Sequence, residues 1–197
     1  MKTLIFAAAA ASLAAPALAL PVQWEVADGG NGHWYELVES SQVWSGARDL
    51  AAGMTHLGMT GYLATITSQE EQDFLSAEVN PDGLEAFLGG SDAEVEGEWR
   101  WVAGPEAGTL FWVGAAAGTA FGFEDWHSGE PNDSTGEDNL LGWSFDSNDW
   151  MDLRSDAVRG AYLVEYSGAS PVPIPAAGGL LAAGVGALSL LRRRRRA

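Results

Sequence analysis

Both ends of the chain are apolar, so the part that can fold as a globular domain lies between them. At the N-terminus, Lys2 precedes an alanine-rich apolar run from Leu4 to Leu18. Ala17-Leu18-Ala19 then supplies the small residues of a cleavage site. This arrangement is typical of a secretory signal, and a buried N-terminal helix is the weaker alternative. We therefore expect residues 1–19 to be a signal peptide and the protein to be exported.

The C-terminus has a second apolar segment with a different character. Residues 172–176 read Val-Pro-Ile-Pro-Ala, the apolar stretch from Ile174 reaches Leu191, and Arg192 to Arg196 follow without a break. Such a stretch is just long enough to span a membrane, and the arginines would remain cytoplasmic. The tail resembles the CTERM sorting signals of Gram-negative bacteria, which an exosortase cuts; a simple membrane anchor is the alternative. Residues 169–197 are thus expected to be a sorting tail that anchors the protein in the inner membrane before it reaches the surface or the medium.

Residues 20–168 are one domain's worth of chain with an extreme charge. All 27 acidic residues lie there, and 10 − 1 − 5 leaves four basic residues, so the formal charge is 4 − 27 = −23. A surface this negative repels nucleic acid and anionic lipid and suits a multivalent cation. The chain has no cysteine. An exported domain without disulfides needs another means of holding its loops.

The first half of the domain shows two helical patterns. Trp44, Ala47 and Ala51 recur at helical spacing, and Arg48 lies in the same run behind Ser41 as a candidate N-cap. A second helix is expected to begin at the capping box Ser68-Gln69-Glu70-Glu71 and to bury Phe74 and Leu75. Strands are expected at residues 32–38 and 61–66.

The second half shows strand patterns around a long irregular segment. Strands are expected at residues 86–89, 98–102, 150–153 and 161–166, with Trp99 and Trp101 on one face of theirs. Residues 104–147 lose regular patterning and are rich in Gly, Asp, Asn and Pro. A loop this long in a compact domain is normally functional. Two helices followed by a long loop set into antiparallel strands predict an α+β fold.

Several motifs in order resemble the C-type-lectin-like domain family. GYLATITSQEEQDFL resembles the entry to its second helix, FLGG its Trp-Ile-Gly-Leu strand, and FEDWHSGEPND its Glu-Pro-Asn loop. DWMDL and YLVEY resemble its closing strands. The resemblance covers residues 32–166 and implies small antiparallel sheets, two helices and a long calcium-binding loop. The family's cysteines are replaced, among others by Asn139, Ser155 and Val164.

The long loop concentrates oxygen ligands. Glu130-Pro131-Asn132-Asp133 and Glu137-Asp138 place five acceptor side chains within nine residues. Calcium prefers six to eight such oxygens, and no histidine or cysteine cluster suggests zinc. By resemblance, Glu130, Asn132 and Glu137 bind a calcium ion and the hydroxyls of a mannose-type sugar, with the proline between the first two in the cis form.

A second, structural calcium ion is suggested by two acids in the turn after residues 88–89. Asp92 and Glu96 match the family's auxiliary site in spacing, and Asp133 and Asp138 would complete it. Calcium that binds only the folded domain stabilises it, and this could replace the missing disulfides.

The closing strand departs from the family, which supplies Asn and then Asp just after a tryptophan. Alignment on Trp150 places Met151 where Asn is expected and leaves Asp152 as the carboxylate. A thioether does not bind a hard cation. In the other register, Asn148 and Asp149 form the pair just ahead of the tryptophan. The Trp150 register is favoured, with Asn148 and Asp149 still able to reach the ion from a lengthened turn.

These observations predict a calcium-dependent lectin for mannose-type glycans rather than an enzyme. The alternative is a non-sugar module of the same fold for adhesion, protein binding or matrix structure, in which calcium is only structural; Met151 supports this alternative. The remaining aromatic and histidine residues are expected to be structural. Core positions are expected for Trp126, Trp143 and Trp150, with Trp143 the one that could be exposed, and structural or surface positions for His33, His56 and His127.

Overall fold

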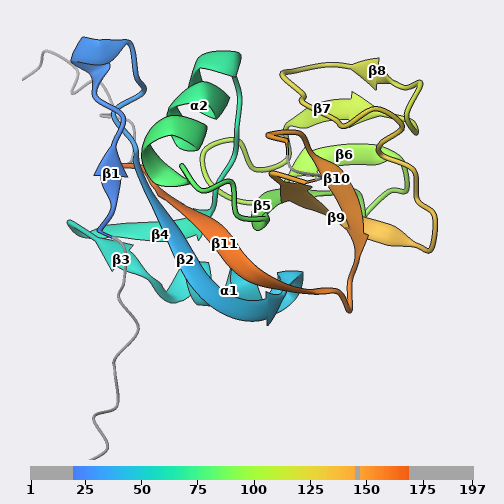
Figure 1. Ribbon diagram of the computed structural model, residues 1–197, viewed down its shortest axis with the longest axis horizontal. Coiled ribbons are helices and arrows are strands. Elements are labelled where there is room, and N and C mark those ends of the chain that lie inside the picture. Colours follow the sequence, from blue (N-terminus) through green and yellow to red (C-terminus); the bar gives the residue numbers. More distant parts are fainter. Residues whose placement is uncertain (1–19, 145–146, 169–197) are drawn as a thin grey trace, which may run out of the picture.

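The computed structural model describes residues 20–144 and 147–168 (Figure 1). The predicted signal peptide and the predicted sorting tail, including its apolar segment, lie outside the described residues. Within the described ranges, none of the helices has the length and apolar character needed to span a membrane.

The described chain forms two α-helices (α1 and α2), a short 3₁₀ helix (η1), a π-helical segment (η2) that continues α2, and a mixed set of strands. In chain order the elements are β1 (Val22–Gln23), η1 (Val26–Asp28), β2 (Trp34–Val43), α1 (Trp44–Gly53), β3 (Thr55–His56), β4 (Met59–Leu63), α2 (Gln69–Phe74), η2 (Leu75–Val79), β5 (Ala86–Ser91), β6 (Glu98–Trp101), β7 (Leu110–Val113), β8 (Thr119–Ala120), β9 (Glu137–Gly142), β10 (Met151–Arg154) and β11 (Val158–Tyr166). The predicted α+β class is confirmed.

The long antiparallel pair β2 and β11 is the centre of the sheet. Its register runs from Trp34 opposite Tyr166 to Val43 opposite Val158. The sheet order over the described residues is β1-β2-β11-β5-β6-β7-β8, with β9 and β10 attached through β5. One pairing differs from the predicted antiparallel sheets, because β11 and β5 run parallel. Figure 1 shows β1 and β3 at one end of the molecule and β6, β7 and β8 at the other.

Strand β11 separates two hydrophobic cores by the alternation of its side chains. Ala161 and Leu163 join the α2-side core, a cluster that includes Tyr35, Ile66, Leu75, Leu88, Trp99, Trp101, Phe111, Leu140, Trp143 and Trp150. Tyr162 and Val164 join the α1-side core, a cluster that includes Trp44, Ala47, Ala51, Leu63, Phe87, Leu141 and Leu153. Successive residues of a strand face opposite sides, so the two helices cover opposite faces of the sheet.

The helix starts were predicted with mixed success. Trp44, Ala47 and Ala51 are buried on α1 as expected. Ser41 does not cap this helix, because β2 continues to Val43 through its pairing with β11. The cap of α2 is confirmed, since Ser68 Oγ accepts from Glu71 N at 3.2 Å.

The predicted loop from residue 104 to 147 contains three strands, β7, β8 and β9. The sequences of these short strands do not alternate between apolar and polar residues in a way that would predict them. Strand pairing with distant segments forms them, since β9 pairs with β5 and β7 pairs with β6. The tryptophan predictions hold in the core: Trp143 and Trp150 are 1% and 0% exposed, and Trp126 packs partly buried against the α2-side core. The expected core position of Trp143 is therefore confirmed, and the alternative of an exposed Trp143 is excluded.

Hydrogen bonds occupy positions where the family has cysteines. Ser155 Oγ donates to Asp138 Oδ2 at 3.0 Å, and Asn139 Nδ2 donates to the Leu153 carbonyl at 3.4 Å. Both bonds join the β9 segment to the β10 segment. Val164 instead packs in the α1-side core.

A buried carboxylate cluster ties α2 to the sheet. Tyr35 Oη donates to Glu71 Oε1 at 2.5 Å, and Thr67 N donates to Glu71 Oε2 at 2.8 Å. Glu165 accepts from Thr65 N at 3.0 Å and pairs with His33 Nδ1 at 2.6 Å. Burial, followed by repulsion from Glu165, raises the pKa of Glu71 to about 7. The bond to Glu165 raises the pKa of His33.

We predict that Glu71 makes the domain less stable as the pH rises. Its ordinary pKa is 4.5 and its folded pKa is about 7, so between these values the folded state binds the extra proton and stability falls with rising pH. Glu71→Gln should remove up to about 3 kcal/mol of that fall between pH 4.5 and 8. Urea unfolding of both proteins across this range measures it.

The control is Glu70→Gln, because Glu70 precedes Glu71 on α2 but is exposed. This variant should keep the wild-type pH dependence. An unchanged slope in Glu71→Gln would show that folding does not raise the pKa of Glu71.

Candidate functional site

The predicted ligand loop begins with Glu130, Pro131 and Asn132. The Glu130–Pro131 peptide bond is cis, as the resemblance implied. Asn132 Nδ2 donates to Glu130 Oε2 at 2.6 Å, so the two side chains flanking the proline face one another. Glu130 is 8% exposed, and burial followed by its interaction with Asp152 raises its pKa to about 7.

Asp152 of β10 is the group that meets this loop. Its carboxylate accepts from Asn132 N at 3.0 and 3.1 Å and from Asp133 N at 2.7 Å. Its side chain is fully buried. The pairing of β10 with β9, in which Asp152 lies opposite Leu140, fixes the position of this carboxylate. The structure thus has the Trp150 register that the sequence favours.

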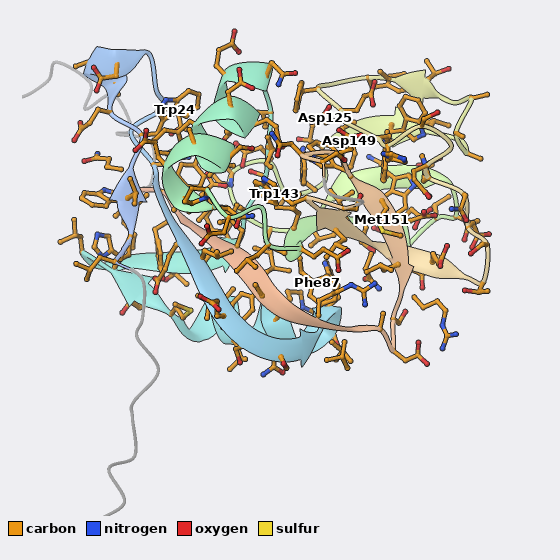
Figure 2. All side chains as sticks on the ribbon, viewed as in Figure 1. Trp24, Phe87, Asp125, Trp143, Asp149 and Met151 are labelled. Atoms are coloured by element: carbon orange, nitrogen blue, oxygen red, sulfur yellow. The ribbon has the colours of Figure 1, made fainter. Side chains whose placement is uncertain are left out.

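Met151 and the pair Asn148-Asp149 lie away from the loop. Met151 packs against the α1-side core, on the opposite face of β10 from Asp152. Asp149 Oδ2 contacts His127 Nδ1 at 2.9 Å, and Asn148 is exposed with its carbonyl accepting from Gln72 Nε2. Figure 2 shows Asp149 next to Asp125 and apart from Met151.

The alternative in which Asn148 and Asp149 join the loop is therefore not the arrangement observed. The physical reason is the backbone around Trp150. Trp150 N donates to the Asp125 carbonyl at 2.7 Å and His127 N donates to the Trp150 carbonyl at 2.8 Å. These bonds hold Asp149 beside the 125–127 segment.

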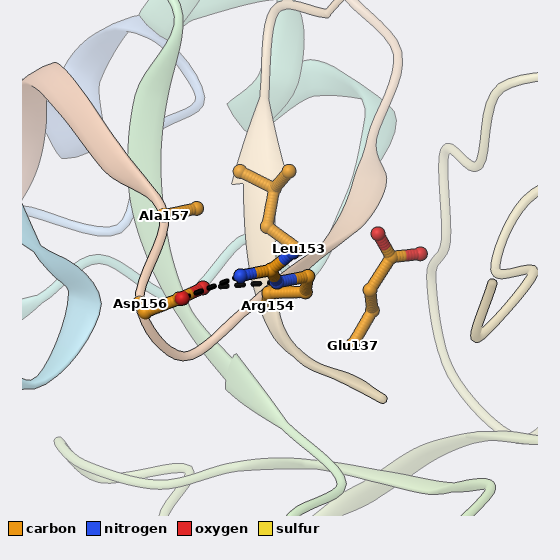
Figure 3. Close-up of a pocket in the computed structure, with 5 residues that line it drawn as sticks. All are labelled: Glu137, Leu153, Arg154, Asp156 and Ala157. Atoms are coloured by element: carbon orange, nitrogen blue, oxygen red, sulfur yellow. Dashed lines mark hydrogen bonds and ion pairs between the residues drawn. The ribbon is translucent and has the colours of Figure 1, made fainter. Parts of the chain in front are cut away.

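Glu137 opens β9 and lies at the border of a small pocket. Its Oε2 accepts from Ser134 N at 3.0 Å and Ser134 Oγ at 2.9 Å. A pocket of about 300 Å³ beside it is lined by Glu137, Leu153, Arg154, Asp156 and Ala157 (Figure 3). Arg154 pairs with Asp156 and leaves the Glu137 carboxylate apart, as Figure 3 shows.

The predicted auxiliary acids line a second pocket. Its volume is about 320 Å³, and its lining residues are Asp92, Glu96, Gly97, Trp99, Gly114, Ala115, Pro131, Asn132, Asp133 and Asp152. It thus joins the predicted auxiliary site to the ligand loop. Asp138, the fourth predicted acid, is not among the lining residues: its carbonyl accepts from Asp92 N at 3.3 Å, and its side chain accepts from Ser155 Oγ.

Asp92 has a buried carboxylate oxygen that accepts no hydrogen bond. It is 2% exposed; its Oδ2 accepts from Gly97 N at 2.9 Å, but its buried Oδ1 has no hydrogen-bond partner. Burial raises the pKa of Asp92 to about 7. Desolvation and then the charges of Asp133 and Asp138 raise the pKa of Glu96. A buried carboxylate oxygen without a donor is costly unless a cation or a proton satisfies it.

The donor set of this region fits calcium. It consists of carboxylate and amide oxygens on a turn and a loop, with no basic side chain lining the pocket. In residues 20–144 and 147–168, no three acidic or histidine side chains already converge on one point. Ion binding would therefore exchange bonds such as Asn132 to Glu130 and Ser134 to Glu137 for bonds to the metal.

Three small wall residues of this pocket escaped the sequence analysis. Gly97 and Gly114 have φ values of 76° and 102°, and Gly114 N donates to the Gly97 carbonyl at 2.8 Å. Ala115 continues the wall. Only the glycine positions in turns could have signalled it.

Comparison with known proteins decides the family. The family model described as Lectin C-type domain matches residues 55–160. The chain belongs to the C-type lectin domain family. Among similar proteins, halomucin of Haloquadratum walsbyi is 39% identical over 167 residues, which are 80% of this chain and 2% of halomucin. C-type lectin domain family 4 member M of Gorilla gorilla gorilla is 34% identical over 94 residues, 48% of this chain and 21% of the relative. The chain therefore spans only a small part of these two relatives.

Solved structures show the same fold. The carbohydrate-recognition domain of cow CD23 has a TM-score of 0.53 and 24% identity over 70% of this chain and 90% of that one. The herring type II antifreeze protein has a TM-score of 0.53 and 19% identity over 68% and 91%. The C-type lectin fold predicted from the sequence is thus confirmed.

We predict that Asp152, and not Asp149, supports calcium binding. Asp152→Asn keeps the size of the side chain but removes the charge that faces Glu130 and the loop amides, so calcium affinity should fall at least about tenfold, roughly 1.4 kcal/mol. Calcium titration followed by tryptophan fluorescence measures the affinity.

Asp149→Asn is the matched control and should bind calcium within about twofold of wild type. A loss in Asp149→Asn with none in Asp152→Asn would contradict the assignment of the closing-strand ligand.

Proposed function

We propose that this C-type lectin domain is a calcium-dependent carbohydrate-binding module for mannose-type glycans. The single observation that supports it best is the convergence of Glu130, Asn132 and Asp152. The Glu130 carboxylate and the Asn132 amide lie on either side of Pro131, with Oε2 and Nδ2 2.6 Å apart. The buried carboxylate of Asp152 accepts a hydrogen bond from the backbone N of Asn132. Glu130 and Asn132 are the pair whose resemblance to the family implies contact with both the ion and two sugar hydroxyls.

In this proposal, Glu130, Asn132, Glu137 and Asp152 hold the sugar-site calcium ion. Asp92, Glu96 and Asp133, with Asp138 through its carbonyl, hold a second ion. Bound calcium would supply a Lewis-acidic point for neighbouring hydroxyls. The protein side chains would orient the sugar: Glu130 accepts a hydrogen bond from one hydroxyl, and Asn132 Nδ2 donates one to the next.

The sequence of the two ends supports a proposal for the location of the protein. We propose export through residues 1–19 and transient anchoring through residues 169–197, with the domain on the outer surface or released. The described chain begins at Leu20 beside β1 and ends at Gly168 after β11, and these strands lie on either side of β2. Both connections therefore leave from one end of the domain.

A non-sugar module of the same fold is the second candidate. Met151 favours it, because a thioether turned into the α1-side core removes one ligand that the family places on this strand. The fold is compatible with such roles, since a herring antifreeze protein shares it.

We predict weak, calcium-dependent binding of mannose-type ligands. A glycan array run with calcium and with chelator tests it, because an open site should need clustered sugars for detectable binding. Glu130→Gln with Asn132→Asp reverses the donor and acceptor order, so mannose binding should fall at least about tenfold while calcium-dependent stability survives.

The matched control is Glu70→Gln with Asn148→Asp, which makes the same exchange at two exposed positions. It should bind like wild type. A wild-type domain that binds calcium but no glycan on the array would favour the non-sugar module.

A further inference from the structure

The hairpin of β7 and β8 forms an open edge of the sheet. β8 (Thr119–Ala120) is last in the strand order and pairs only with β7, through Trp112 opposite Ala120 and Val113 opposite Thr119. Figure 1 shows β8 on the outer side of the β5-β6-β7 layer, far from β1 and β3. An edge strand leaves backbone donors and acceptors that another strand can pair with.

This edge is uncharged in a domain that is otherwise densely acidic. From Ala107 to Phe123 no residue is charged, although the domain carries 4 − 27 = −23. Natural edge strands are usually protected by charged side chains or proline, and this hairpin has neither. The other long uncharged run, Leu50 to Gln69, contains the β3–β4 hairpin at the end where the described chain begins and ends.

The edge also displays apolar groups on an ordered turn. Residues 115–117 and 119–122 are exposed, and Phe121 is 63% exposed. Phe121 N and Gly122 N both donate to the Phe111 carbonyl, at 2.8 and 3.2 Å. The backbone of Phe121 is thus fixed to β7, so the ring is presented to solvent from a hydrogen-bonded segment.

We propose that the β7–β8 hairpin is a self-association surface that pairs with the same hairpin of a second copy of this chain. Charge favours this occupant: two molecules of −23 repel wherever acidic faces meet, and residues 107–123 add no charge of their own to the contact. Acids of the neighbouring pocket lie beside Gly114 and Ala115. Antiparallel pairing of β8 with β8 of the second copy about a two-fold axis uses the same patch on both molecules, as a closed dimer requires.

The proposed geometry would bring two ligand sites close together. Gly114 and Ala115 precede β8 and also line the pocket of Asp92 and Asp133. A dimer through this hairpin therefore holds two such pockets near one interface. The resulting gain in affinity for clustered sugars rests on the proposed function, whereas self-association itself does not.

Sedimentation velocity of residues 20–168 over a concentration series tests the proposal without any glycan. The wild type should show a reversible monomer–dimer equilibrium. Raising salt from about 0.01 to about 0.15 M shortens the screening length from about 30 to about 8 Å. The dimer should therefore strengthen severalfold with salt, whereas an interface held by ion pairs would weaken.

Phe121→Glu should weaken the dimer at least tenfold, because it places like charges at the paired edge. Leu57→Glu is the matched control, since Leu57 is 74% exposed on the β3–β4 hairpin and adds the same charge. It should leave the dimer within about twofold. Ala116→Glu, at an exposed position of the turn between β7 and β8, repeats the test if Phe121→Glu unfolds.

A wild type that stays monomeric at all concentrations overturns the proposal. So does an equal loss of dimer in Leu57→Glu, or a dimer that weakens as salt rises. Failure of glycan binding with an intact dimer would contradict only the proposed function.

Discussion

The buried carboxylate of Asp152 links the long loop to the sheet, and the candidate site depends on that link. Its oxygens accept from the backbone amides of Asn132 and Asp133, so the segment after Pro131 is attached to β10. Such bonds to a charged acceptor contribute about 1.5–3 kcal/mol each. In a chain without cysteine, this attachment and the Ser155–Asp138 bond connect segments that would otherwise be free to separate.

Further acidic side chains lie close to Asp152 in the candidate site. Glu130 lies next to Asp152, and Asp92 lies in the adjoining pocket with an oxygen that nothing in the described chain satisfies. Burial and the neighbouring Asp152 raise the pKa of Glu130, so its ionised form opposes folding. A divalent cation would remove this opposition by adding charge and ligands at once. Calcium binding and folding stability are thus expected to be coupled through one pocket.

The elements that follow from local chemistry were predictable, and those that follow from distant pairing were not. Spacing located Trp44, Ala47 and Ala51 on α1, and Ser68 marked the start of α2. Nothing local shows that β5 runs parallel to β11, or that Leu110–Val113 becomes a strand beside β6. Similarly, Ser41 has the character of a cap but lies in β2, because β11 extends the strand past it.

The candidate site shows the same division. Glu130 and Asn132 were identified from the resemblance to the family, and Asp92 and Glu96 from their match to the spacing of its auxiliary site. Asn132, Asp92 and Glu96 line one pocket, and Glu130 contacts Asn132. The choice between Asp152 and Asp149 needed the structure, since only the backbone bonds of Trp150 show that Asp149 faces His127. The pocket wall at Gly97 and Gly114 needed it as well, because two turns distant in sequence form it together.

Thermal unfolding of residues 20–168 with millimolar calcium and with chelator tests most directly whether a cation holds the acidic pocket together. Saturation at about 100 times Kd contributes about 2.7 kcal/mol, so the melting temperature should be higher with calcium by about 5 °C or more. Identical melting temperatures in the two conditions would contradict both predicted calcium sites.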